Sequence, residues 1–155
     1  MSGVRLVRDY PHPPAKVWRA ITDPELIALW GMRPEGFSTE VGTRFKFFAK
    51  PNPRWRGFIE CEMLEARAPS LLRYAWMGNE GEAPTVVTYT LTPRAGGTRL
   101  LFEHTGFVGV QGLLLAKLVM APGMRKMLRS TIPAVLAELD GTGNLRPGSA
   151  LRPQF

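Results

Sequence analysis

His104 is the residue best suited to acid–base chemistry in this sequence. It lies on the apolar face of an alternating segment, Thr98 to Gly106. Because an imidazole titrates near neutral pH, an inward His104 could orient or deprotonate a bound molecule. Tyr74 and Tyr89 lie on neighbouring alternating segments, so their hydroxyls are expected within its reach. These three are the candidate catalytic residues, but an inward histidine can equally be a structural hydrogen-bond donor, and both alternatives stay open.

Metal and nucleophile chemistry find little support in the sequence. His12, His104 and Cys61 are the only soft ligands, and they lie far apart at no metal-binding spacing. The sequence contains no G-x-S-x-G elbow, no H-E-x-x-H motif and no phosphate-binding glycine loop before a helix. We therefore expect no metal and no cofactor.

Six segments alternate between apolar and polar residues with period two. In one of them, Leu72, Tyr74 and Trp76 lie opposite Arg73. This pattern is typical of antiparallel strands that face water on one side. Short turns rich in Gly, Pro and Asn connect most of them. The predicted strands are Val4 to Tyr10, Arg44 to Lys50, Arg56 to Ala66, Leu71 to Met77, Thr85 to Thr92 and Thr98 to Gly106.

The last two strands should form a hairpin around the tight turn PRAGG. Such a hairpin pairs Tyr89 with Phe102 and Val87 with His104, and it places Trp76 on the next strand. The imidazole is therefore expected among aromatic rings.

Three-and-four-residue periodicity predicts the helices. Two short helices, AKVWRAIT and ELIALW, follow the first strand, and Asp23-Pro24-Glu25 is a typical start for the second. A long helix is expected from Pro122 to Asp140, with a kink at Pro133, which lacks a backbone N–H. The apolar character of GVQGLLLAKLVMAPG, and not its periodicity, suggests a separate short helix, Gln111 to Met120, over the mouth of a cavity.

The apolar faces of the strands and of the long helix should converge on one interior. Aromatic side chains form stiff walls and methionines adapt to irregular shapes, so this interior could bind a planar or acyl ligand. The same side chains could instead simply be the core. The expected ligand-binding residues are Phe45, Phe47, Met63, Tyr74, Trp76, Tyr89, Phe102, His104, Met124, Met127 and Leu128.

Composition sets the remaining limits. The chain has 155 residues, 45% of them hydrophobic, which suits a single domain over residues 1–140 with a flexible tail over residues 141–155. The net charge is +7, and one acid-free basic run extends from Arg44 to Arg56. We interpret this run as a solvated face and expect no nucleic-acid partner. The lone Cys61 suits a reducing compartment, and no apolar run is long enough to span a membrane, so a cytoplasmic location is expected.

Several motifs together resemble a known superfamily. They are Val17-Trp18 followed by Thr22-Asp23-Pro24 and Trp30, the turn from Gly96 to Arg99, and His104 before Gly106-Phe107. In these the sequence is similar to START-like (SRPBCC) proteins, in the branch named after the activator of heat-shock-protein-90 ATPase homologue, which covers many small bacterial proteins. The resemblance implies an α+β helix-grip fold. In it a curved antiparallel sheet of six strands wraps around the long C-terminal helix, with two short helices after the first strand.

The expected function is binding or carriage of a hydrophobic small molecule, such as a lipid, a polyketide or an aromatic metabolite. One alternative is a cyclase or hydrolase that uses the same cavity with His104 and a tyrosine, although we expect a protein that is not an enzyme. Another is a chaperone-partner module that uses the basic run from Arg44 to Arg56. Whether two copies of the chain form a homodimer is left open.

Overall fold

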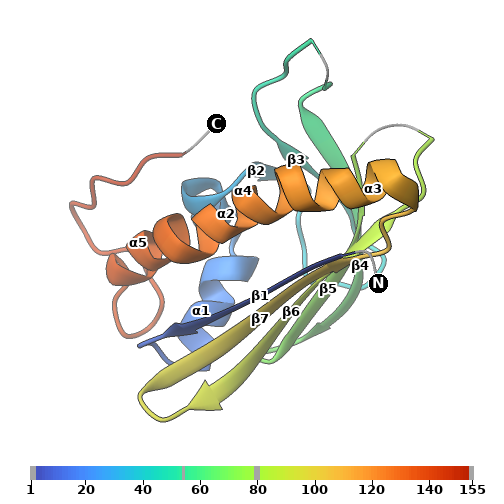
Figure 1. Ribbon diagram of the computed structural model, residues 1–155. Helices are drawn as coiled ribbons and strands as arrows, with labels where there is room; N and C mark the ends of the chain where they lie inside the picture. The colour runs from blue at the N-terminus through green and yellow to red at the C-terminus, as the bar shows by residue number, and fades with distance from the viewer. Residues whose placement is uncertain (1–2, 54, 79–80, 154–155) are drawn as a thin grey trace.

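Seven antiparallel strands form one curved sheet, and a long helix lies across it (Figure 1). The computed structural model describes residues 3–53, 55–78 and 81–153. The spatial order of the strands is β1-β7-β6-β5-β4-β3-β2. The strands are β1 (Gly3–Tyr10), β2 (Arg33–Glu35), β3 (Arg44–Phe48), β4 (Phe58–Arg67), β5 (Leu71–Met77), β6 (Thr85–Arg94) and β7 (Gly97–Thr105). This is the predicted α+β helix-grip architecture.

The prediction of six strands was wrong by one. No strand was predicted at β2, but it pairs with β3, placing Pro34 opposite Phe47. Because β2 is at the edge of the sheet, the missing N–H of Pro34 costs no bond to a further strand. Three residues that include a proline carry no period-two signal, which is why the sequence did not reveal this strand.

Alternation positions the inward side chains as predicted. On β7, Leu100, Phe102 and His104 are buried, whereas Arg99 and Glu103 on the other face are more exposed. The β6–β7 hairpin pairs Tyr89 with Phe102 and Val87 with His104. The expected register is therefore confirmed.

Two glycines make the β6–β7 turn possible. Gly96 has a φ of +78°, a conformation that residues with a Cβ rarely adopt. A Cβ on Gly97 would overlap the carbonyl oxygen of Tyr10 on β1. The turn therefore fixes both the hairpin and its approach to the neighbouring strand.

Two short helices follow β1 and pack against the end of the long helix. They are α1 (Pro14–Thr22) and α2 (Pro24–Trp30). The Asp23 side chain accepts a hydrogen bond from the Glu25 N–H at 2.9 Å and caps α2, as the sequence predicts. The Trp30 indole donates to the Ala20 carbonyl at 2.8 Å, which ties the two helices together.

The C-terminal helix begins earlier than predicted and is continuous. It comprises α3 (Gly109–Leu115), a π-helical turn η1 (Ala116–Met120), α4 (Ala121–Lys126), a second π-helical turn η2 (Met127–Thr131) and α5 (Ile132–Ala137). The residues that join these segments keep right-handed helical dihedrals. The separate helix expected at Gln111 to Met120 is thus the first part of one long helix, which ends at Ala137 and not at Asp140.

Both interior prolines of this helix follow a π turn. Ala121 donates its N–H to the Ala116 carbonyl, five residues back, and Pro122 follows. Ile132 likewise donates to the Met127 carbonyl, and Pro133 follows. Where a kink was expected at Pro133, the structure has a wider turn just before it, which accommodates a residue that has no N–H.

The two π turns keep the buried side chains of the helix on one line. An α-helix turns about 100° per residue, so a four-residue repeat drifts by about 40° per step, or about 200° over five steps. Each π turn holds roughly one extra residue and so reverses about 100° of this drift. Both turns together cancel it. The inward residues are Ala116, Met120, Met124, Leu128, Ile132 and Leu136.

Tyr10 compensates for a backbone group that η2 leaves without its helical partner. The Leu128 carbonyl would ordinarily accept from residue 132 or 133, but Ile132 donates to Met127 and Pro133 has no N–H. The buried Tyr10 hydroxyl donates to the Leu128 carbonyl at 2.7 Å. This bond links the first strand to the last helix and satisfies a buried acceptor.

After the helix, the chain folds back along α1. Leu139 and Leu145 form a β-bridge, and the Arg146 N–H donates to the Glu138 carbonyl at 2.8 Å. Leu151 packs against the core. The expectation that residues 141–155 are flexible stays a prediction, and residues 154 and 155, like Arg54 of the basic run, lie outside the described residues.

Removing the Tyr10 hydroxyl tests its role in the helix. Tyr10→Phe leaves the Leu128 carbonyl buried without this donor, so the free energy of unfolding should fall by about 1–3 kcal/mol in urea denaturation. Pro133→Ala restores an N–H nearby and should recover part of this loss. Pro122→Ala, at the matching position after η1, is the control and should recover none. Strictly additive effects of Tyr10→Phe and Pro133→Ala would contradict this explanation.

Candidate functional site

The concave face of the sheet carries a continuous set of aromatic rings. Phe45 contacts Phe47 and Tyr74 with ring centroids 5.4 Å apart in both pairs. Tyr74 is followed by Tyr89 at 6.2 Å and Tyr89 by Phe102 at 5.3 Å. Most of these pairs adopt edge-to-face or tilted geometries, which are favourable for aromatic rings. The rings therefore form a wall that runs from β3 to β7.

The structure gathers the eleven expected ligand-binding residues around this wall. Trp76 and Met127 are partly buried and pack against the core. That these side chains bind a ligand stays a prediction. The other nine are buried: Phe45, Phe47, Met63, Tyr74, Tyr89, Phe102, His104, Met124 and Leu128.

Two tyrosine hydroxyls meet within the wall. The Tyr74 and Tyr89 oxygens lie 3.4 Å apart. Burial raises the pKa of Tyr89 to about 12 and raises the pKa of Tyr74 well above its ordinary value. Both phenols are therefore neutral at physiological pH and can offer hydrogen bonds, but neither can serve as a base there.

The partner of His104 differs from the one expected. Its Nε2 lies 2.7 Å from the Thr85 hydroxyl, and no tyrosine hydroxyl takes that position. Thr85 in turn donates to the Trp76 carbonyl at 3.2 Å. Because a hydroxyl has one proton, His104 donates through Nε2, and its lone pair lies on Nδ1. Thr85, Val87 and Tyr89 are spaced two residues apart on β6, so their side chains lie on the same inner face. This spacing could have identified Thr85 from the sequence.

Burial keeps the imidazole neutral. His104 is 1% exposed, with the ring centroids of Phe107 and Trp76 at 4.6 Å and 5.3 Å. Burial lowers the pKa of His104 to about 4. A group with this pKa is a weak base near pH 7, so the site is better suited to hydrogen bonding than to proton abstraction.

Other reactive groups contribute little. Cys61 is a buried free thiol, and burial raises its pKa, so little of it is thiolate at neutral pH. Within residues 3–53, 55–78 and 81–153, no three His, Cys, Asp or Glu side chains are grouped to hold a metal ion. Over the same residues, no helix combines the length and apolar character that crossing a membrane requires.

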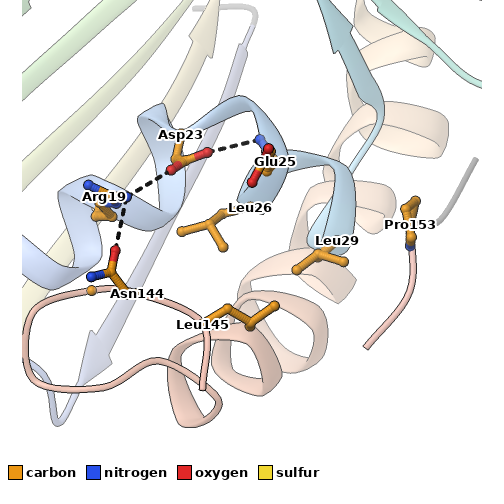
Figure 2. Close-up of a pocket in the computed structure, with 9 residues that line it drawn as sticks. Arg19, Asp23, Glu25, Leu26, Leu29, Asn144, Leu145 and Pro153 are labelled. Atoms are coloured by element: carbon orange, nitrogen blue, oxygen red, sulfur yellow. Dashed lines mark hydrogen bonds and ion pairs between the residues drawn. The ribbon is translucent and has the colours of Figure 1, made fainter. Parts of the chain in front are cut away.

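A hollow of about 300 Å³ lies where the C-terminal segment passes α1 and α2 (Figure 2). Arg19 bridges Asp23 at 3.3 Å and the Asn144 side chain at 3.1 Å, while Leu26, Leu29 and Leu145 form an apolar side. The polar groups here hold the chain end against α1. A second hollow, of about 410 Å³, lies at the β6–β7 turn. Both are separate from the aromatic wall.

The burial of His104 predicts acid-sensitive stability. Its pKa is lower in the folded than in the unfolded chain, so its contribution is present above pH 6.5 and is lost as pH falls toward 4. Between pH 7 and pH 5 the free energy of unfolding should fall by ~2 kcal/mol from this group. His104→Gln should lose this part of the pH dependence in urea denaturation, whereas an unchanged slope would contradict the assignment.

Comparisons with known proteins agree with this architecture. Protein MLL2253 from Mesorhizobium loti is 34% identical, with a TM-score of 0.69 over 82% of this chain and 94% of that one. CalU16 from Micromonospora echinospora is 24% identical, with a TM-score of 0.65 over 84% of this chain and 75% of that one. A protein from Arthrobacter aurescens is 22% identical, with a TM-score of 0.73 over 90% of this chain and 88% of that one. The last two show the fold alone. No curated protein matches. A family model matches residues 11–137, so the chain belongs to the activator of Hsp90 ATPase homolog 1-like family.

Proposed function

We propose that this protein binds or carries an apolar small molecule between the concave face of the sheet and the C-terminal helix. The observation that carries the proposal is the wall of aromatic and methionine side chains with few polar groups in it. Burying ~300 Å² of apolar ligand surface would yield about 7 kcal/mol before the costs of immobilisation, so micromolar affinity is the expected scale. A lipid, a polyketide or an aromatic metabolite has suitable chemistry.

The polar groups in the wall suit a neutral ligand. His104 is uncharged because burial lowers its pKa to about 4, and the Tyr74–Tyr89 pair is uncharged because burial raises both pKa values. A charged ligand would lose its hydration without gaining a counter-charge here. A ligand with one or two carbonyl or hydroxyl oxygens could replace the weak 3.4 Å contact between the two tyrosines.

The packing of the C-terminal helix suggests the route of entry. The rings of the wall are in contact with one another, so a ligand must separate the helix from the sheet. In α3 no residue is fully buried, and in η1 only Ala116 is. Segments with few buried contacts open at low cost, so the first part of the helix is the natural lid.

Carriage is favoured over the two alternatives by specific contacts. A cyclase or hydrolase would need a base near neutrality, which the low pKa of His104 does not provide. A chaperone partner would bind the basic run through its positive charge. Arg44 pairs with Glu62 at 3.4 Å and Arg56 with Glu60 at 3.2 Å, and these two carboxylates reduce the net charge of that face.

Ligand binding can be tested with a hydrophobic dye and matched variants. Nile red should bind the purified protein and be displaced by members of a lipid and aromatic library. Trp76→Ala and Met127→Ala should each weaken dye affinity by roughly tenfold, because each removes a large apolar contact. Met77→Ala is the control, since Met77 follows Trp76 in β5 and points to the other face. Equal effects of Trp76→Ala and Met77→Ala, or no displacement by any compound, would refute the proposal.

His104→Ala separates carriage from catalysis. For a carrier, the affinity for the displacing compound should change by less than about tenfold, because one neutral hydrogen bond contributes about 1 kcal/mol. For an enzyme, turnover of that compound by the wild-type protein would be detectable by mass spectrometry and would collapse in the variant.

A further inference from the structure

The outer surface of α3 and η1 is unusually apolar. Of the eleven large hydrophobic side chains exposed among the described residues, seven lie between Val108 and Val119. Val110 is 75% exposed, Leu118 70% and Val119 58%. Exposed hydrophobic residues scattered singly are ordinary, but a concentration on one segment marks an interaction surface. We call the exposed residues 108–119 the apolar patch.

The charges along the same helix are all of one sign. Residues 104–137 contain no Asp or Glu, while Lys117, Arg125, Lys126 and Arg129 are exposed. Within the described residues, none of the ion pairs uses these four cations. The helix therefore offers an uncompensated positive charge next to the apolar patch.

The geometry of the helix puts both features on the solvent side. Because inward residues recur at 116, 120, 124 and 128, residues two positions later point outward. Leu114 and Leu118 share this outward line with Lys126. Figure 1 shows that the helix lies across one side of the sheet, with α3 at the end away from α1 and α2. Leu118 and Lys126 thus face the same direction, and Arg125 and Arg129 lie on one flank of the same exposed surface.

We propose that this helix docks the protein onto an anionic membrane surface. The apolar patch would enter the boundary between headgroups and acyl chains, and the four cations would contact anionic headgroups. The charge argues against a second copy of this chain, because pairing two such faces would bring eight like charges together without an acid. The docking needs only the exposed face, so it does not depend on the proposed ligand-binding function.

Vesicle sedimentation of the full chain tests this inference. The protein should sediment with vesicles of equal parts phosphatidylcholine and phosphatidylglycerol, and more weakly with phosphatidylcholine alone or at high salt. The triple variant Arg125→Gln, Lys126→Gln, Arg129→Gln should weaken binding to the anionic vesicles by roughly a hundredfold. Leu118→Ser with Val119→Ser should also weaken it, at unchanged charge.

The matched control is Val41→Ser. Val41 is 65% exposed but lies in the loop before β3, so its replacement should leave vesicle binding unchanged. Circular dichroism and thermal unfolding should show that all variants fold as the wild type does. The proposal is overturned if the protein stays in the supernatant with anionic vesicles. It is also overturned if Leu118→Ser with Val119→Ser abolishes a dimer seen by analytical ultracentrifugation while vesicle binding is unaffected.

Discussion

The fold depends on keeping one line of side chains pressed against a curved sheet over the length of the C-terminal helix. An unbroken α-helix could not do so with a four-residue repeat, because the repeat would wind around its axis. The two π turns remove this drift, and Pro122 and Pro133 occupy the positions that follow them. Tyr10 then satisfies the buried carbonyl that the second turn releases. A single geometric constraint thus accounts for both prolines, the tyrosine and the buried stripe.

The same helix divides into two parts with different roles. Its C-terminal part, from Met124 to Leu136, is anchored by fully buried residues such as Leu128 and Ile132. Its N-terminal part is anchored mainly by Ala116 and exposes apolar side chains to solvent. The end of the helix with the fewest buried residues is therefore also the end whose outer face is apolar. If both proposals hold, contact with a membrane would occur at the lid of the ligand site.

Much of this architecture could be predicted from the sequence because alternation and turn chemistry are local signals. The PRAGG turn fixed the pairing of Val87 with His104, and Asp23 marked the start of α2. Features without a local period were missed. β2 is too short to show an alternating pattern. Pro122 was interpreted as the start of a helix because the π turn before it, which lets the helix continue through the proline, has no signature in the sequence. Thr85 was overlooked because other threonines of β6, such as Thr88 and Thr90, point outward. Its position, two residues before Val87, places its side chain on the inner face.

Methionine-methyl NMR tests most directly the central proposal, that an apolar ligand binds between the sheet and the C-terminal helix. Met63 comes from the sheet, on β4, and Met124 from the helix, on α4, whereas Met77 follows Trp76 on the other face of β5. Adding a compound that displaces Nile red should shift the methyl signals of Met63 and Met124 together and leave Met77 nearly unchanged. Shifts confined to Met77, or none at Met63 at saturating compound, would contradict the account.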